Sequence, residues 1–326
     1  MISTEKGNVI SRTADAGDGL ECQRRSPFYI GGLWAVGAWA MATNLTEALL
    51  RKSLNGGAPL GKILWEMGRD SNHVSSFFFD RFSRYNHQVK YGAASWRALD
   101  IFYNYHEQVA PQLKGALEGI LTSHWLEKSE NGQALTNRLK LVVEFLSRAF
   151  DEYRGEKEIR LLSIASGSAQ AVIKAMKKEP HLNVRAVLID MDETAIAEAK
   201  RLTREAGLAD RFSFVCDSTQ ALEKVATDFG PHIIEMVGFL DYRPHRKAVE
   251  LVSRIREHLP EGGIFMTCNI RRNREKIFPD WVLLWPMIYR TEREFADILV
   301  HGGFLPDKID LVYEPHRIHG IAVCRK

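Results

Sequence analysis

The stretch Leu161–Ala171 constrains the fold of this chain more than any other. It begins with a short apolar run of strand length, Leu161–Ala165, passes through small residues around Gly167, and restarts as a helical pattern that reaches Met176. A strand, a turn of small residues and a helix form the first half of a nucleotide-binding βαβ unit. Small side chains let a ligand approach the backbone, and the helix N-terminus offers N–H groups. Gly167 is the one glycine present from the usual G-x-G-x-x-G loop, so the prediction depends on the pattern of the residues C-terminal to it.

Four further apolar runs lie beyond this stretch, with room for a helix between successive runs. They are Ala186–Ile189, Phe212–Cys216, Ile233–Val237 and Ile264–Cys268. Strands that alternate with helices predict a parallel sheet covered on both faces. Ligands of such sheets bind at the carboxyl ends of the strands, and polar residues collect there: Ser166, Asp190, Asp217, Asp241 and Asn269. Asp190 follows Gly167 by twenty-three positions, close to the spacing of about 20 at which an acid reaches the ribose hydroxyls of a nucleotide.

From about residue 155 to 326 the sequence resembles the class I S-adenosylmethionine-dependent methyltransferases. In that family an acid-x-Gly-x-Gly-x-Gly loop holds the methionine end of the cofactor. Residues 163–169 fall on this loop, with Ser163 in place of the acid and alanine at two glycine positions. The C-terminal pattern is the most specific part of the likeness. Thr291–Phe295 through Phe304, then strands at Lys308–Tyr313 and His319–Cys324, looks like the family's last helix and antiparallel final strand.

The resemblance implies an α/β fold, a Rossmann-like class I methyltransferase sheet that is parallel with an antiparallel last strand. A dehydrogenase-type sheet continues in parallel instead. The resemblance also implies S-adenosyl-L-methionine as the cofactor. The residues that it places around the methionine end, the ribose and the adenine are Ser163, Ala165, Ser166, Gly167, Asp190, Met191, Asp217 and Ser218.

Composition excludes several other classes of function. The formal net charge of +3 is small, whereas proteins dedicated to nucleic acids usually show a strongly basic face. The four cysteines are scattered without a C-x-x-C pair, which favours free thiols in a reducing, cytoplasmic compartment. The eleven histidines show no H-E-x-x-H spacing, so we expect no metal site.

We expect three segments along the chain: a disordered stretch at residues 1–26, a helical cap at 27–150 and the cofactor-binding domain at 151–326. Phe28–Ala42 is uncharged and apolar, but it is shorter than the roughly 20 residues that a membrane span needs. We expect it to pack as a buried or lid helix. A twin-arginine export signal, beginning at Arg24 and Arg25, is the alternative.

The N-terminal domain is predicted to be all-helical. Its helical patterns cover Thr46–Leu54, Pro59–Arg69, Ser75–Tyr85, Ala93–Val109, Pro111–His124 and Ala134–Phe150. Ser75–Tyr85 carries aromatic residues at positions i, i+4 and i+7, which is the spacing of an amphipathic helix. The many aromatic side chains are typical of an ordinary core. Alternatively, Tyr85, Tyr91 and Tyr103 line a substrate pocket, since buried tyrosine hydroxyls need hydrogen-bond partners.

The candidates for catalysis lie in and after the fourth strand. Asp241 and Tyr242 follow this strand, and Glu235 is a carboxylate within its apolar run. An aspartate can orient or deprotonate an amine or hydroxyl, and a tyrosine can hold it in line. The alternatives are that Asp241 caps the helix beginning near His245 and that Glu235 bonds to neighbouring backbone. After the fifth strand, Asn269 and a basic run from Arg271 could clamp an acidic substrate, although such runs are usually solvated.

The sequence therefore predicts an enzyme, an S-adenosylmethionine-dependent methyltransferase acting on a nitrogen or oxygen of a small molecule, without nucleic-acid or membrane partners. Transfer of the cofactor's aminocarboxypropyl group is the alternative within the family. A nicotinamide-dependent oxidoreductase and a non-catalytic protein that binds the cofactor are the alternatives outside it. The residues leave the substrate and the oligomeric state open.

Overall fold

The computed structural model describes residues 9–16, 19–54, 59–70, 72–73 and 83–326. These residues divide into two compact units. The sheet unit takes its residues from 1–20, 137–271 and 288–326, and the helical unit from 21–136 and 272–287. The expected boundary at 150/151 thus differs from the observed one in two places. The helical unit ends at residue 136, and a later segment, 272–287, returns to it.

The sheet unit is built on one mixed sheet of eight strands in the order β1-β7-β8-β6-β5-β2-β3-β4. The strands are β1 (Ser11–Thr13), β2 (Ile159–Ile164), β3 (Val184–Asp190), β4 (Phe212–Cys216), β5 (Ile233–Met236), β6 (Ile264–Ile270), β7 (Ile309–Tyr313) and β8 (His319–Arg325). Strands β2 to β6 pair in parallel, whereas β8 runs antiparallel to both β6 and β7. The predicted parallel sheet with an antiparallel last strand is confirmed.

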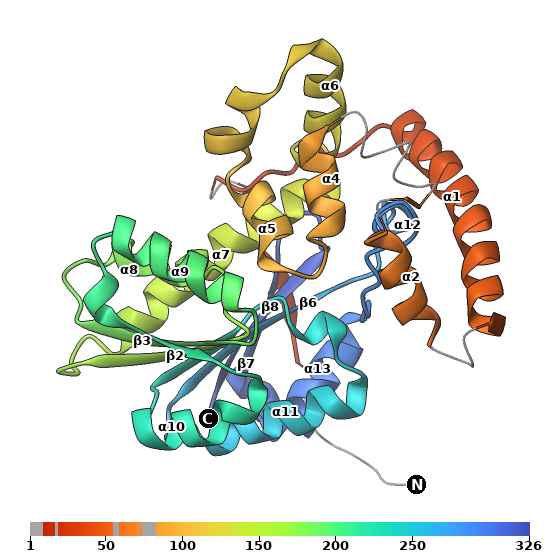
Figure 1. Cartoon of the computed structure of the whole chain (residues 1–326). Coiled ribbons are helices and arrows are strands. Elements are labelled where there is room, and N and C mark those ends of the chain that lie inside the picture. The colour runs from red at the N-terminus through yellow and green to blue at the C-terminus, as the bar shows by residue number, and fades with distance from the viewer. Residues whose placement is uncertain (1–8, 17–18, 55–58, 71, 74–82) are drawn as a thin grey trace, which may run out of the picture. The chain divides into compact units, whose positions relative to one another are not determined.

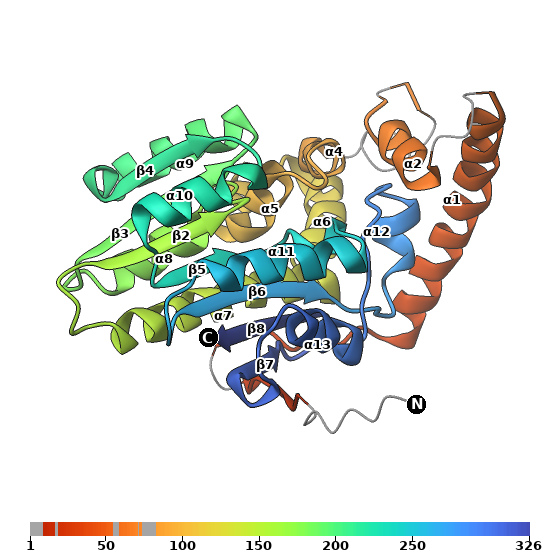
Figure 2. The ribbon, with the colours of Figure 1, turned by 90° about the horizontal axis from the view of Figure 1, so that it is seen from below.

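Helices cover both faces of this sheet (Figures 1 and 2). One face packs against α7 (Glu130–Glu152, from residue 137), α8 (Gln170–Lys178) and α9 (Glu193–Glu205), and the other against α10 (Leu222–Phe229), α11 (His245–Glu257) and α13 (Glu292–His301). Successive side chains of a strand point to opposite faces, so Leu161 and Leu162 belong to different core clusters. Both are fully buried, which is why the strand reads as a continuous apolar run.

The first strand departs from the expectation of disorder over residues 1–26. Residues Ser11–Thr13 pair in parallel with β7 at the edge of the sheet. Arg12 forms an ion pair with Asp310 at 2.9 Å, and the Ser11 hydroxyl donates to Glu292 at 2.5 Å. The strand buries little apolar surface, since its side chains are half-buried or exposed. Its backbone and polar contacts hold it, and hydrophobic patterning does not reveal these.

The helical unit contains α1 (Pro27–Leu54), α2 (Leu60–Gly68), α4 (Arg84–Tyr91), α5 (Trp96–Tyr103), α6 (Gly115–Leu126) and α12 (Ile277–Trp281), together with the start of α7. The predicted helical N-terminal region is confirmed, although several predicted boundaries shift. Phe28–Ala42 and Thr46–Leu54 are one continuous helix, α1. Ala93–Val109 is the shorter α5, followed by a π-helical turn over Tyr105–Val109. Pro111–His124 starts later, at Gly115. Most of the predicted helix Ser75–Tyr85 lies outside the described residues.

Helix α1 has one buried stripe, and its packing explains why it does not break in the middle. Gly37 lies against Ile277 of α12, where a Cβ atom would come within 2.7 Å of the isoleucine side chain. Asn44 lies about two helical turns further along α1. It is buried and donates its side-chain N–H to the carbonyl of Trp281 at 2.7 Å. None of the helices in the described part of the chain is both long enough and apolar enough to cross a bilayer.

Candidate functional site

The loop between β2 and α8 has an unusual backbone. Ala165, Gly167 and Ala169 all adopt left-handed conformations, with φ of 51°, 54° and 56°. For alanine this region costs roughly 1–2 kcal/mol. The two alanines at glycine positions of the loop therefore keep backbone conformations that glycine adopts freely. Strain of this kind persists where the surrounding structure enforces it, and such places are often ligand sites.

The Ser166 hydroxyl and the start of helix α8 are the polar features of the loop. The Ser166 hydroxyl oxygen is buried and has no hydrogen-bond partner among the described residues. Helix α8 begins at Gln170, and its N-cap Ala169 provides no side-chain acceptor. The first N–H groups of a helix have no partner within the helix, so this end suits a polar ligand.

Asp190 ends β3 and closes over the loop. Its Oδ2 accepts from the Gly167 N–H at 2.8 Å, and its Oδ1 accepts from the Asp192 N–H at 2.9 Å. The first of these hydrogen bonds joins the carboxylate of Asp190 to the glycine loop. A carboxylate has about four lone-pair sites, and these two bonds use two of them. The side chain is half-buried, which leaves it within reach of a ligand.

The neighbours of Asp190 extend this edge of the sheet. Met191 is 74% exposed although its side chain is apolar. The Asp217 N–H, at the end of β4, donates to the Asp190 carbonyl at 3.0 Å. The Asp217 side chain is exposed and accepts from the Ser218 N–H at 2.6 Å, while the Ser218 hydroxyl caps the short helical turn at Thr219–Ala221. The structure thus brings the six predicted residues from Ser166 to Ser218 to one edge of three neighbouring strands.

Glu235 lies on β5, directly opposite Ser163 on β2 in the parallel register. The Ser163 hydroxyl donates to Glu235 Oε2 at 2.5 Å, and the Val237 N–H donates to Oε1 at 3.0 Å. Both side chains are buried. Burial raises the pKa of Glu235 from 4.5 to about 7, although these two hydrogen bonds and the positive charge of Arg138 lower it in part.

Asp241 is buried in a hydrogen-bonded network that joins three chain segments. Its Oδ1 accepts from the Ile270 N–H at the end of β6, and its carbonyl accepts from the Ile288 N–H, both at 2.7 Å. Burial raises the pKa of Asp241 to about 6. Helix α11 begins after Pro244 without a side-chain cap, so Asp241 does not cap it.

Arg290 belongs to the same hydrogen-bonded network. Its guanidinium donates to the carbonyls of Leu240 and Arg243 and to the side chain of Asn269. The Asn269 amide also donates to the Ile288 carbonyl at 3.2 Å. Residues 272–287 belong to the helical unit. Ile270 precedes this segment and Ile288 follows it, and both are residues of the sheet unit that bond to Asp241 and Asn269. Both predicted site residues are built into the fold here.

The remaining predicted residues of the sheet unit differ in their surroundings. Tyr242 is half-buried in the turn after β5, where its N–H donates to the Phe239 carbonyl at 3.1 Å. Arg271 forms an ion pair with Glu292 at 3.4 Å. In the helical unit, Arg274 of the same basic run pairs with Glu130. Two of the cations expected to clamp a substrate, Arg271 and Arg274, are thus already paired with carboxylates of the chain.

The three predicted tyrosines lie in the helical unit. The Tyr85 hydroxyl accepts from Arg84 at 2.8 Å and donates to Gln112 at 3.1 Å. It belongs to a cavity of about 280 Å³ whose other lining residues are Arg84, Gln88, Asp100, Ile101, Gln108, Val109 and Gln112. Tyr91 stacks on His87 with ring centres 4.2 Å apart. Tyr91 and Tyr103 do not line this cavity.

Sequence reasoning missed three residues near the carboxyl ends of β5 and β6. Arg138 on α7 is 3% exposed, and its charge lowers the pKa of both Glu235 and Asp241. Burial lowers the pKa of His319 well below 6.5, and its buried Nδ1 has no partner among the described residues. Arg290 is the third. Arg138 carried a signal, a cation within an amphipathic helical pattern, whereas nothing local marks the other two. In the described part of the chain, no group of three or more metal-ligating side chains converges on one point.

Comparison with known proteins gives a family and a fold. A family model described as "Putative methyltransferase" matches residues 84–326. A structure from Bordetella parapertussis, described as a possible exported protein, matches with a TM-score of 0.60 and 16% sequence identity. The match covers 89% of this chain and 96% of the Bordetella chain. An O-methyltransferase family protein from Burkholderia thailandensis has a TM-score of 0.48 and 14% identity, covering 93% and 74%. A Geobacter sulfurreducens methyltransferase in complex with S-adenosyl-L-homocysteine has a TM-score of 0.32 and 21% identity, covering 40% and 48%. No curated protein matches the chain.

Proposed function

The chain belongs to this methyltransferase family, and we propose that it transfers a methyl group from S-adenosyl-L-methionine to a nitrogen or oxygen atom of a small molecule. The observation that carries the proposal is the β2–α8 loop closed by Asp190. Three features together form a polar site that a ligand can approach closely: the left-handed alanines, the buried Ser166 hydroxyl, which has no partner among the described residues, and the start of α8, which the Ala169 side chain does not cap. The site lies at the carboxyl ends of the strands, where ligands of such sheets bind.

The residues of this edge fit the cofactor chemically. The two remaining lone-pair sites of the Asp190 carboxylate can accept from the ribose hydroxyls. The exposed Met191 side chain offers an apolar, polarizable surface for the adenine ring. Asp217 and Ser218 can take the polar edge of that ring, and the Ser166 hydroxyl and the first turn of α8 can bind the cofactor's carboxylate.

The cofactor supplies a methyl group on a positively charged sulfur, which leaves as a neutral thioether when a lone pair attacks in line. The protein must hold the attacking atom in line and keep water away. We assign this positioning to Tyr242, which follows β5 at the same edge. Its hydroxyl would orient the acceptor, and its ring would shield the sulfonium from water.

Two rival activities make different predictions. Aminocarboxypropyl transfer would use the same cofactor site, so only the mass added to the product distinguishes it. A nicotinamide-dependent oxidoreductase is disfavoured by the antiparallel β8, which pairs along all of β6. A cytoplasmic location and a small-molecule substrate complete the proposal. They rest on where the cofactor is made and used and on the small net charge.

The test is calorimetric titration of the full-length protein with S-adenosyl-L-homocysteine. We expect the wild type to bind and Asp190→Ala to lose about 10- to 100-fold in affinity, the scale of a charged hydrogen bond. Asp228→Ala is the matched control, because Asp228 is an exposed acid on α10. Its affinity should stay within about twofold of the wild type. Binding of NADH without binding of S-adenosyl-L-homocysteine would reject the proposal.

A further inference from the structure

The loop that receives the cofactor has lost its acid, and an acid stands one strand away. Ser163 occupies the position at which the resemblance expects a carboxylate. Glu235 is its register partner on β5, and the two side chains share a hydrogen bond of 2.5 Å. Neighbouring strands lie about 4.8 Å apart. The carboxylate is thus displaced sideways by one strand while it remains at the same level of the sheet.

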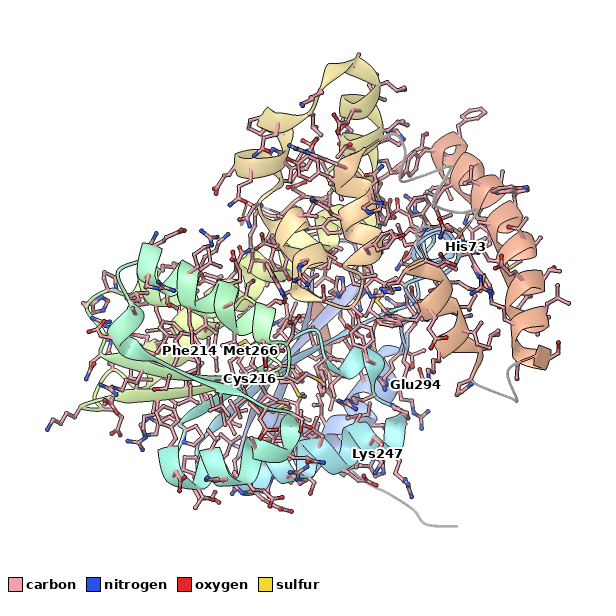
Figure 3. All side chains as sticks on the ribbon, in the orientation of Figure 1. His73, Phe214, Cys216, Lys247, Met266 and Glu294 are labelled. Carbon is pink, nitrogen blue, oxygen red and sulfur yellow. The ribbon has the colours of Figure 1, made fainter. Side chains whose placement is uncertain are left out.

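Glu235 is unusual for the position that it holds. It is 6% exposed, and its register partner on the other side is Met266, an apolar core residue labelled in Figure 3. A buried carboxylate is unfavourable unless it is hydrogen-bonded and its charge is balanced. The Ser163 hydroxyl and the Val237 N–H provide two hydrogen bonds. The second of these lies at the carboxyl end of β5, so the carboxylate bonds at the edge of the sheet where ligands bind.

Two cations could balance this charge. One belongs to the protein, since the charge of Arg138 acts on Glu235. The other would come from the cofactor, whose amino acid end carries an ammonium group with three N–H donors. An ammonium is a compact point charge, and a carboxylate with two lone-pair sites left can accept from it.

Resting on the proposed cofactor, we propose that Glu235 replaces the acid missing at position 163 and binds the ammonium group of the cofactor, while the Ser163 hydroxyl holds its carboxylate in place. Recognition of the cofactor's amino acid end then requires the pair, with one residue from each strand. Arg138 supports the pair electrostatically and takes no part in binding the ligand.

Two ligands separate this role from a structural one. S-Adenosyl-L-homocysteine carries the ammonium group, whereas 5′-methylthioadenosine keeps the nucleoside and the sulfur but lacks the amino acid. Calorimetry should show that Glu235→Gln, a neutral residue of the same shape, lowers the affinity for the first ligand by about 10- to 100-fold. Its affinity for the second ligand should stay within about twofold of the wild type. Ser163→Ala, which keeps the charge, should lower the affinity for the first ligand by a smaller factor, about 3- to 10-fold.

The exchanged variant, Ser163→Asp with Glu235→Ser, is the sharpest control. It returns the acid to β2 and places the hydroxyl on β5, so it should recover at least part of the affinity for S-adenosyl-L-homocysteine that Glu235→Gln loses. If Glu235→Gln binds S-adenosyl-L-homocysteine as the wild type does, or weakens both ligands equally, Glu235 is a structural partner of Arg138 and the inference is wrong. If the wild type binds neither ligand, the proposed cofactor itself fails. Should Glu235→Gln not fold, the comparison of both ligands on Ser163→Ala decides in the same way.

Discussion

Two parts of the carboxyl edge of the sheet hold their polar side chains in opposite ways. At the ends of β3 and β4, Asp190 and Asp217 are half-buried or exposed and accept hydrogen bonds from backbone N–H groups. At the ends of β5 and β6, Asp241, Asn269 and Arg290 are buried and bond to one another's chain segments. Asp190 and Asp217 keep hydrogen-bonding capacity available, whereas Asp241, Asn269 and Arg290 use theirs within the fold.

The difference separates ligand recognition from positioning. A side chain with unused lone pairs at a strained loop can bind a ligand directly. A buried side chain that ties three segments together affects the reaction through the position of its neighbours. Asp241 belongs to the second kind, since it bonds to the backbone of Ile270 at the end of β6 and of Ile288, and Tyr242 follows it directly in the chain. Substitutions in each of these two groups of strand ends test this comparison most sharply.

The largest effect is expected for Asp241→Ala. This change leaves the Ile270 N–H without its acceptor and removes the first of the opposite charges that act on Arg290. Breaking a buried charged pair typically costs about 3–5 kcal/mol, and urea unfolding followed by circular dichroism measures it. Asp241→Asn keeps an acceptor oxygen and should lose less than half as much. An unfolding midpoint for Asp241→Ala equal to that of the wild type, together with a large drop in turnover, would instead make Asp241 a catalytic residue.

The second effect is a pH dependence that Glu235 introduces. Burial raises the pKa of Glu235 from 4.5 to about 7, so the folded chain holds this proton more tightly than the unfolded chain does. The stabilisation is complete below about pH 4.5 and is lost as the pH rises through 7. Glu235→Gln lacks this loss. It should match the wild type near pH 4.5 and exceed its free energy of unfolding by up to about 3 kcal/mol at pH 8.

Unfolding curves at several pH values check this prediction, with Ser163 and Arg138 unchanged as the groups that face Glu235. A constant difference between the two proteins from pH 5 to 8 would mean that Glu235 does not titrate in this range.

The sequence predicted the residues at the ends of β2, β3 and β4 better than the buried network of Asp241, Asn269 and Arg290. Strand ends are readable because apolar runs stop at polar residues, and parallel strands bring those residues to one edge. The spacing of Asp190 from Gly167 predicted an acid of the cofactor site, but it did not predict the hydrogen bond between these two residues. The hydrogen bonds of Arg290 could not be predicted, because its guanidinium donates to the Leu240 carbonyl and to the Asn269 side chain, which lie 50 and 21 residues earlier in the sequence. The Ser163–Glu235 contact depended on the register of two strands, which the sequence left open.

The helical unit shows a second limit. Helical periodicity identified its elements, but the tertiary contacts of Gly37 and Asn44 with α12 set the continuity of α1. Those contacts come from a segment more than 200 residues later in the chain. The same distance explains why the return of residues 272–287 to the helical unit was not expected.

A third, smaller effect tests the apolar surface beside Asp190. Met191→Ala removes most of an exposed side chain that touches no core cluster. The unfolding free energy should therefore change by less than about 0.5 kcal/mol. If the side chain covers the adenine ring, the affinity for S-adenosyl-L-homocysteine should fall by roughly 3- to 10-fold, corresponding to about 1 kcal/mol. Unchanged affinity in calorimetry would place the adenine elsewhere.

The smallest effect concerns the strain in the loop itself. Ala165→Gly and Ala169→Gly would each relieve a left-handed alanine, worth roughly 1–2 kcal/mol, but would add about 0.5–1 kcal/mol of chain entropy to the unfolded state. Each variant should therefore be more stable than the wild type by about 0.5–1 kcal/mol in urea unfolding. Ala197→Gly, on an exposed position of α9, is the control and should lose about 1 kcal/mol. Equal losses at all three positions would show that the loop alanines carry no strain. The ends of β2, β3 and β4 would then differ from the ends of β5 and β6 only in their available hydrogen-bonding capacity.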